Sequence, residues 1–187
     1  MTGLRRLSHA VAEGDGISIL VEVADRAAAR TAEAEGAEGL AVRGHAAGVR
    51  EASQLPLLWT AGSFRAAKEA GADAVVLVAE AAGDRLEELF EEAHELGLEC
   101  VVKVRDEEEL ERVLERVDPE IFLLSAEDAE AGQHHLDRLL ELLPDVPAGK
   151  LAIAELPSAG GEDLAALERA GVDAVLVATL SGDRLPG

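Results

Sequence analysis

Short apolar runs alternate along the chain with charged segments whose apolar residues recur at the period of an α-helix. In the segment 84–96, apolar residues lie at i, i+3, i+4 and i+7 from Leu86, which gives a helix one apolar stripe and one acidic face. Strands that are apolar throughout, each followed by a helix, indicate a parallel sheet that is covered on both sides. The runs predicted to be strands are Ile17–Val23, Gly39–Val42, Leu55–Trp59, Ala74–Val78, Cys100–Val104, Ile121–Leu124, Leu151–Ala154 and Ala174–Val177.

Eight predicted strands are the number that closes a barrel of alternating strands and helices. The sequence AGADAVVLV at 70–78 recurs as AGVDAVLV at 170–177, so the fourth and eighth strands of the series resemble each other. This repeat favours two similar half-barrels, whereas the alternative, an open flavodoxin-like sheet, gives no reason for it. We therefore predict one domain over residues 1–187 with a minimal (β/α)8 TIM-barrel fold.

The predicted barrel has little sequence to spare. A typical barrel of this kind has about 250 residues, against 187 here. The chain stops at Gly187, where the repeat places the start of a last helix, so we expect helix eight to be missing or vestigial. Residues 2–12 carry Leu4, Leu7 and Val11 on one helical face, and we expect this helix to cover part of the seam between the last and the first strand. An uncovered seam would be an exposed apolar patch through which two copies could associate.

Composition narrows the classes of partner. Hydrophobic residues make up 48% of the chain and aromatic residues only 2%, so the core must be aliphatic. The 38 acidic and 17 basic residues give a net charge of −21, which repels phosphate backbones and anionic lipid surfaces. Nucleic acid and membranes are therefore not expected as partners. No apolar run is long enough to span a bilayer or to act as a signal peptide, so a cytoplasmic location is expected.

Cysteine, histidine and tryptophan supply few candidates for chemistry. Cys100 is the only cysteine and begins an apolar strand, which indicates a buried thiol and no intramolecular disulfide. His134-His135 are adjacent, so on a helix they point to different faces and do not chelate, and no metal is expected. Arg43 and His45, after the second strand, offer some positive charge to an anion. Trp59, the only tryptophan, is expected to point outward to the helices.

Several stretches of the chain resemble indole-3-glycerol-phosphate synthases. They are LVEV at 20–23, AGADAV at 70–75, LGLECVVKVRDEEELER at 96–112 and GVDAVLV at 171–177. The resemblance extends over residues 17–180, and the fifth strand with the acidic helix start that follows it is the most specific part. It implies a cofactor-independent lyase of tryptophan biosynthesis. Such an enzyme closes the indole ring of a phosphorylated carboxyphenylamino-deoxyribulose with loss of carbon dioxide and water.

The resemblance implies catalytic residues at the carboxyl ends of the strands. Glu22 and Glu155 match the family's glutamates on the first and seventh strands. The family's lysine on the third strand, its general acid, falls on Thr60, and its lysine on the first strand falls on Ala24. Lys103 replaces the family's glutamate on the fifth strand, and we interpret it either as a salt-bridge partner or as a relocated general acid.

The positions implied to contact the substrate and its phosphate have also changed. The family's asparagine pair on the sixth strand falls on Ser125 and Ala126. Pro157 stands in the family's phosphate-binding turn after the seventh strand and has no backbone N–H to donate. Gly160-Gly161 present amides that suit either an anion or a plain helix start. Four polar side chains remain as candidates for substrate binding: Thr60, Ser125, Ser158 and Thr179.

Three functional hypotheses follow. The first is an enzyme of this family that acts on a phosphorylated small molecule through Glu22, Lys103 and Glu155. The second is a barrel that has lost the synthase activity and binds an unknown ligand. The third is another phosphosugar enzyme on the same scaffold. The family's Ser-Pro-Ser segment after the first strand, which the resemblance implies binds phosphate, falls on residues 25–29 and is replaced by DRAAA. The joint loss of two lysines and these serines favours weak or absent activity, because removing even one preorganised electrostatic group commonly costs several kcal/mol of transition-state stabilisation.

Overall fold

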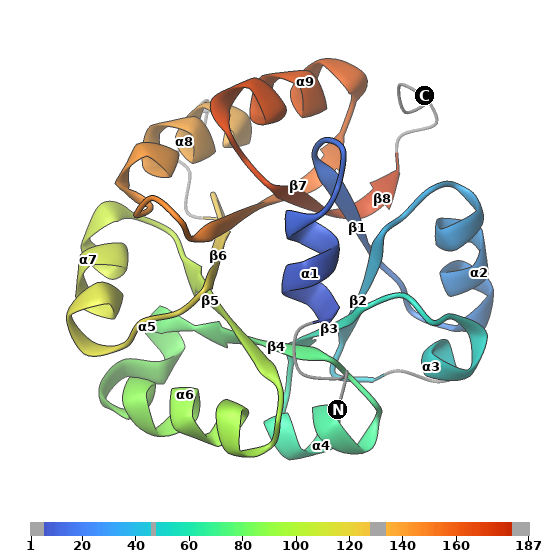
Figure 1. Cartoon of the computed structure of the whole chain (residues 1–187), viewed down its shortest axis with the longest axis horizontal. Helices are drawn as coiled ribbons and strands as arrows, with labels where there is room; N and C mark the ends of the chain where they lie inside the picture. The colour runs from blue at the N-terminus through green and yellow to red at the C-terminus, as the bar shows by residue number, and fades with distance from the viewer. Residues whose placement is uncertain (1–5, 46–47, 128–133, 181–187) are drawn as a thin grey trace.

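The chain folds into a closed barrel of eight parallel strands that follow one another around the barrel in chain order (Figure 1). The computed structural model describes residues 6–45, 48–127 and 134–180. The closed barrel confirms the predicted fold, and the open sheet is wrong. The strands are β1 (Ser18–Glu22), β2 (Gly39–Arg43), β3 (Leu57–Ala61), β4 (Ala74–Val78), β5 (Glu99–Val104), β6 (Ile121–Leu124), β7 (Leu151–Ala159) and β8 (Ala174–Leu180).

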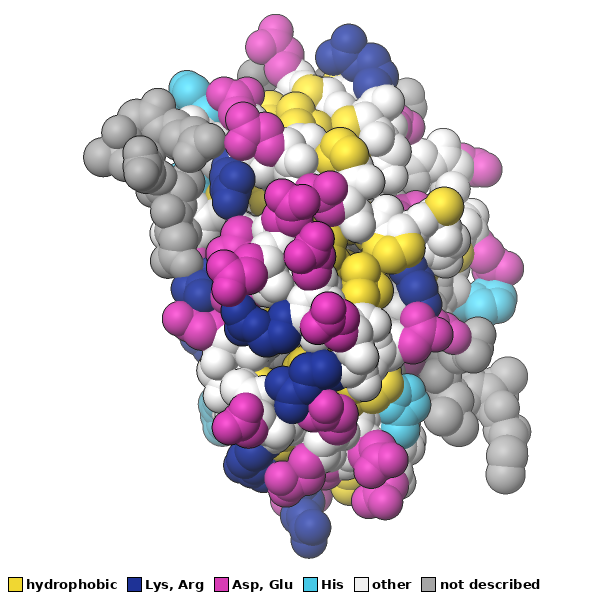
Figure 2. Space-filling model, turned by 90° about the vertical axis from the view of Figure 1, so that its left-hand side faces the viewer, with side chains coloured by type: hydrophobic (Ala, Val, Ile, Leu, Met, Phe, Trp, Pro, Cys, Tyr) yellow, Lys and Arg dark blue, Asp and Glu magenta, His cyan; other side chains and the backbone are white. Residues whose placement is uncertain are grey.

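Helices surround the barrel and connect its strands (Figure 1). They are α2 (Arg26–Ala34), α3 (Val49–Ala52), α4 (Phe64–Glu69), α5 (Ala79–Ala82), α6 (Leu86–Glu95), α7 (Glu107–Arg116), α8 (His135–Leu142) and α9 (Gly161–Ala170), with 3-10 turns at Gly83–Arg85 and Leu143–Asp145. Acidic side chains are spread over their outer faces, with Lys and Arg among them, as Figure 2 shows for the side of the molecule that carries α7. The acidic residues therefore form solvated helix faces, as the sequence pattern predicted.

The sequence repeat has a structural cause. Its two copies form the starts of β4 and β8, as predicted. Asp73 accepts a hydrogen bond from the backbone N–H of Leu57 at 2.9 Å, and Asp173 accepts one from Ala152 at 2.8 Å. The glycine two residues earlier has a positive φ in both copies, 78° and 95°. Each copy is therefore a tight turn whose aspartate ties a new strand to the start of the preceding one, and Arg50 braces Asp73 at 2.7 Å.

The core has two layers because successive strand residues face opposite sides of the barrel wall. The outer layer, between the wall and the helices, includes Trp59 and Phe122, so the outward direction predicted for Trp59 is confirmed. The interior layer is aliphatic, as the composition predicted. Its strand residues are Leu20, Ala41, Leu58, Ala74, Val76, Val101, Ile121, Leu123, Ile153, Ala174 and Leu176.

The first helix, α1 (Arg6–Ala12), lies across the barrel axis in Figure 1. Leu7 and Val11 pack into the interior layer and are 0% and 3% exposed. The prediction that this helix covers the seam between β8 and β1 is therefore wrong. Periodicity identified the buried face of the helix correctly, but it carried no information about which surface that face meets.

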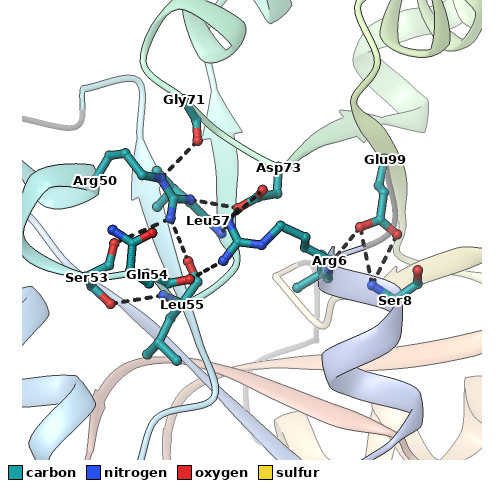
Figure 3. A network of polar contacts seen from close by, with 11 residues as sticks. Arg6, Ser8, Arg50, Ser53, Gln54, Leu55, Leu57, Gly71, Asp73 and Glu99 are labelled. Atoms are coloured by element: carbon teal, nitrogen blue, oxygen red, sulfur yellow. Dashed lines mark hydrogen bonds and ion pairs between the residues drawn. The ribbon is translucent and has the colours of Figure 1, made fainter. Parts of the chain in front are cut away.

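Polar contacts fix α1 at the end of the barrel where the strands begin (Figure 3). The Glu99 carboxylate accepts hydrogen bonds from the backbone N–H groups of Leu7, at 2.7 Å, and Ser8, at 3.1 Å. The Arg6 guanidinium lies 3.1 Å from Asp73. Burial raises the pKa of Glu99 above its usual value, although these amides and the Ser8 hydroxyl favour the charged form. The helix thus closes the end of the barrel opposite to the mouth described below.

The seam between β8 and β1 is a regular parallel pairing that runs from Ser18 opposite Ala174 to Val21 opposite Val177. The outer-layer residues Ile19, Val21, Val175 and Val177 are at most 7% exposed, so the seam is not the apolar patch expected of an uncovered one. Self-association there stays a prediction. The expectation for helix eight concerns residues beyond Leu180, which lie outside the described part of the chain. None of the described helices is long and apolar enough to cross a membrane.

Candidate functional site

The carboxyl ends of the eight strands surround the mouth of the barrel, where barrels of this type carry their active sites. Every second residue of a strand faces inward. The mouth therefore receives polar side chains from five strands and from the residue that directly follows β6. Five of these residues are catalytic or substrate-binding candidates from the sequence: Glu22, Thr60, Lys103, Ser125 and Glu155. The mouth residues with inward parity are Glu22, Arg43, Thr60, Lys103, Ser125 and Glu155.

Lys103 lies between two carboxylates. Its side chain is 11% exposed, and its Nζ lies 2.8 Å from Oε2 of Glu155 and 2.9 Å from Oε2 of Glu127. Oε2 of Glu155 is buried and accepts no well-aligned hydrogen bond within the described residues, so the contact with Lys103 is an ion pair. Burial alone lowers the pKa of Lys103, but the two carboxylates outweigh it and the pKa lies above the usual value. The ammonium therefore holds its proton more tightly than a free lysine does.

The turn after β5 holds Lys103 in place. Asp106 begins α7 by accepting a hydrogen bond from the N–H of Glu109 at 2.8 Å. The buried Glu109 carboxylate accepts one from the N–H of Arg105 at 2.9 Å and also pairs with its guanidinium. Arg105 reaches Glu80 of α5 at 2.9 Å. This is the segment with the most specific resemblance in the sequence, and its charged residues fix the end of the strand that carries Lys103.

Glu22 and Arg43 form the second ion pair of the mouth. Their closest charged atoms are 3.5 Å apart, and the side chains are 33% and 69% exposed. A long, solvated pair of this kind contributes little to stability. The structure thus brings Lys103 together with Glu155, while Glu22 pairs with its neighbour on β2.

Thr60 and Ser125 are both occupied with backbone groups. The Thr60 hydroxyl donates to the carbonyl of Val42 at 3.1 Å. Ser125 is 1% exposed, and its hydroxyl oxygen accepts a long hydrogen bond from the N–H of Glu127 at 3.4 Å. This hydrogen bond lies in the turn after β6 that brings Glu127 to Lys103. Sequence reasoning missed Glu127, and the only signal for it was an acid two residues past a strand end beside a strand with an inward lysine.

The end of β7 differs from its sequence prediction. The strand continues to Ala159, and its extension pairs Ser158 with Thr179 of β8. Ser158 is exposed, and the side chain of Thr179 lies outside what the structure describes. The N–H of Gly160 donates to the Asp163 carboxylate at 2.9 Å, so α9 has an ordinary helix start with a carboxylate at its first amide.

A cavity of about 160 Å³ opens in the mouth beside β6, β7 and β8. It is smaller than the roughly 300–1,000 Å³ of typical small-molecule sites. Its lining has three carboxylates and one guanidinium. The lining residues are Glu22, Arg43, Ser125, Ala126, Glu127, His135, Glu155, Leu156, Pro157, Leu176 and Ala178.

Of the other chemical candidates, Cys100 lies away from the mouth and His135 lies at its edge. Cys100 is buried, and burial raises the pKa of its thiol to about 12, which leaves it an unreactive thiol at neutral pH. His134 and His135 lie at the start of α8, and His135 reaches the mouth cavity. Within the described residues, no three His, Cys, Asp or Glu side chains come together as a set of metal ligands.

Comparison with known structures supports the fold. The N-acetylmannosamine-6-phosphate 2-epimerase from Clostridium perfringens superposes with a TM-score of 0.72 at 13% identity, over 86% of each chain. The thiamine phosphate pyrophosphorylase from Pyrococcus furiosus does so with a TM-score of 0.67 at 17% identity, over 88% of this chain and 86% of the other. Identities this low establish a shared fold only.

Sequence comparison is more specific. An indole-3-glycerol phosphate synthase from Geobacillus sp. (strain WCH70) is 33% identical over 141 residues, 72% of this chain and 55% of the relative. One from Nocardioides sp. (strain ATCC BAA-499 / JS614) is 36% identical over 135 residues, 69% of this chain and 52% of the relative. The chain thus spans about half the length of these curated relatives. The family model for indole-3-glycerol phosphate synthase matches residues 61–181, more than half of the chain. The chain therefore belongs to the indole-3-glycerol phosphate synthase family.

Proposed function

We propose that this chain is a ligand-binding barrel of the family that does not close the indole ring of a carboxyphenylamino-deoxyribulose phosphate. The observation that carries the proposal is the pair of carboxylates around Lys103, at 2.8 and 2.9 Å. The resemblance implies a cationic general acid at the mouth, and Lys103 is the buried lysine in that region among the described residues.

The ion pairs make Lys103 a poor general acid. Their carboxylates raise its pKa, which moves it away from the near-neutral value that suits proton donation. Donating the proton would also leave Glu127 and Glu155 facing each other without a cation between them. The positions that the resemblance gives to the family's lysines hold Ala24 and Thr60, and the Thr60 hydroxyl is bound to a neighbouring strand.

The phosphate end of the site supports the same conclusion. The segment around Ser158 is part of the ladder between β7 and β8, so it does not form the compact turn that gathers amides around an anion. The amide of Gly160 already donates to the Asp163 carboxylate. A phosphorylated substrate would also have to enter a cavity of about 160 Å³ lined by three carboxylates, on a chain of net charge −21.

The direct test is incubation of the full chain with the carboxyphenylamino-deoxyribulose phosphate while indole fluorescence is followed. The relative from Geobacillus sp. (strain WCH70) is the positive control. We expect no product above the rate without protein. Product from this chain that is abolished by Glu22→Gln and by Lys103→Met, but not by Arg112→Gln on the exposed face of α7, would refute the proposal. That result would favour the alternative, a lyase with Glu22, Lys103 and Glu155 as catalytic residues.

A further inference from the structure

The mouth cavity has more negative than positive charge around it. Three carboxylates and one guanidinium line it, and the ammonium of Lys103 lies beside two of the carboxylates, those of Glu127 and Glu155. With histidine counted as neutral, as at pH 7, three negative charges among the described residues therefore face two positive ones. One negative charge is left over. Because the walls of a concave site focus the field of its charges, this excess attracts a cation into the cavity.

Two of the carboxylates and a serine hydroxyl have spare capacity to accept hydrogen bonds. A carboxylate offers about four lone-pair sites. Within the described part of the chain, the one polar contact of the Glu22 carboxylate is with Arg43, at 3.5 Å, and that of the Glu155 carboxylate is with Lys103, at 2.8 Å. Ser125 also lines the cavity and is 1% exposed, and its oxygen accepts a single long hydrogen bond from a backbone N–H at 3.4 Å. These oxygens are best matched by a ligand that donates several hydrogen bonds.

Strand β8 leaves room for such a ligand. The ladder between β1 and β8 ends one residue before Glu22 and Ala178, so these two residues lie side by side. Ala178 comes two residues after Leu176, whose side chain belongs to the interior layer, so its methyl group faces the cavity that it lines. On the other side of β8, Glu155 of β7 pairs with Leu176. A methyl group thus stands between two strands that carry carboxylates, and the cavity of about 160 Å³ there admits only a small molecule.

We propose that the mouth cavity binds a small organic cation that carries N–H groups, such as a primary ammonium or a guanidinium. The inference rests on the proposed function, because it names the class of ligand that this barrel binds. The N–H groups of the cation donate to the carboxylates of Glu22 and Glu155 and to the Ser125 hydroxyl, and its charge balances the excess carboxylate. An anion of the same size would face three carboxylates instead.

The test is a titration of the full chain with methylammonium chloride at constant ionic strength, balanced with sodium chloride. Binding heat and the backbone amide signals in a ¹⁵N–¹H NMR spectrum are followed, and we expect saturable binding with shifts at Ser125, Leu176 and Ala178. Tetramethylammonium has the same charge but no N–H group, and formamide has N–H groups but no charge. Each should bind at least about tenfold more weakly, the factor that corresponds to losing one charge-assisted hydrogen bond. Guanidinium at low millimolar concentration should bind at the same residues.

Variants test the residues that form the site. Ala178→Leu keeps every charge but fills the cavity, and because Ala178 is exposed, the larger side chain should be tolerated while binding is lost. Glu22→Gln and Glu155→Gln should each weaken binding about tenfold or more, because each removes a charged acceptor. Glu111→Gln on the exposed face of α7 removes the same charge elsewhere and should leave the affinity unchanged. Circular dichroism checks that each variant is folded, and the three site variants are independent of one another.

Three results would overturn the proposal: methylammonium that acts no differently from sodium, tetramethylammonium or formamide that binds as well as methylammonium, or folded site variants that all keep the original affinity. The indole fluorescence assay decides the proposed function separately. A chain that forms no indole and binds no methylammonium would refute the ligand class alone. A chain that forms indole would refute the proposed function, whatever its response to methylammonium.

Discussion

The role of α1 as the closure of the barrel is tested most directly by shortening Leu7. Leu7→Ala removes a fully buried side chain, 0% exposed, from the end of the interior layer. A core Leu→Ala change costs about 2–5 kcal/mol, because transfer free energy is lost and a cavity remains. At about 3 kcal/mol, and with roughly 2–4 °C per kcal/mol for a chain of this size, the Tm should fall by about 6–12 °C.

The stability lost in Leu7→Ala has an upper limit that tests how α1 is attached. Because α1 has only seven residues, a weakened helix can leave its site while the barrel stays folded. The cost then cannot exceed the free energy of docking α1, and Leu7→Ala and Val11→Ala combined would cost less than the sum of the two. Urea unfolding gives the loss of stability in each single variant and in the double variant. Hydrogen exchange at the amides of Leu7 and Ser8, which donate to Glu99, reports whether the helix has left its site.

The matched control is Leu114→Ala on α7, a leucine that is only partly buried against the outer layer. It should cost clearly less than Leu7→Ala. The reasoning fails if Leu7→Ala costs no more than about 0.5 kcal/mol, the range of ordinary surface substitutions. It also fails if the amides of Leu7 and Ser8 exchange as fast as those of an unstructured peptide in the unmodified chain.

Four further predictions follow from charges and burial. Lys103→Met should destabilise the chain by about 1–2 kcal/mol at pH 7, a value reduced because Glu127 is mostly exposed. Folding raises the pKa of Lys103, so its ion pairs contribute fully to the stability of the folded chain below the unfolded pKa. This contribution is lost as the pH rises through the folded pKa. The urea midpoints of wild type and Lys103→Met should therefore converge at strongly alkaline pH. Since folding also raises the pKa of Glu99, wild type should gain stability relative to Glu99→Gln as pH falls from 7 through the folded pKa, and an unchanged difference would contradict the burial of this charge. Cys100 should react with a thiol reagent only at the rate of unfolding, because its thiol is buried with a pKa of about 12. The net charge of −21 predicts that Tm rises when sodium chloride is added to a low-salt buffer, and a flat response would show that self-repulsion is unimportant.

The sequence was sufficient for the parts of the fold that repeat. All eight predicted strands overlap observed ones, because apolar continuity and strand–helix alternation describe a barrel wall without any long-range information. The destination of α1 was not predictable, since an amphipathic pattern names the buried face of a helix but not its partner. The extension of β7 to Ala159 was also missed, because Pro157 and Ser158 look like a turn when their pairing with β8 is unknown.

At the mouth, too, the sequence predicts some features of the site and not others. The resemblance placed Glu22, Lys103 and Glu155 at the carboxyl ends of their strands, and these ends meet at one end of a barrel of parallel strands. The contact of Lys103 with Glu127 depends on a short turn after β6 that has no periodicity to count. The indole N–H of Trp59 has no acceptor among the residues that the structure describes, and this was equally hidden because it depends on the three-dimensional surroundings of the side chain.

The closure of the barrel by its first helix has a consequence for synthesis on the ribosome. The acceptors that hold α1 lie far along the chain: Arg6 contacts Asp73, 67 residues later, and Leu7 donates to Glu99, 92 residues later. During synthesis α1 therefore waits, with Leu7 and Val11 exposed, until the start of β5 has been made. Contacts at such separations form late in folding because a long loop must close first. The helix α1 precedes all eight strands in the chain, yet it is expected to be among the last elements to reach its place.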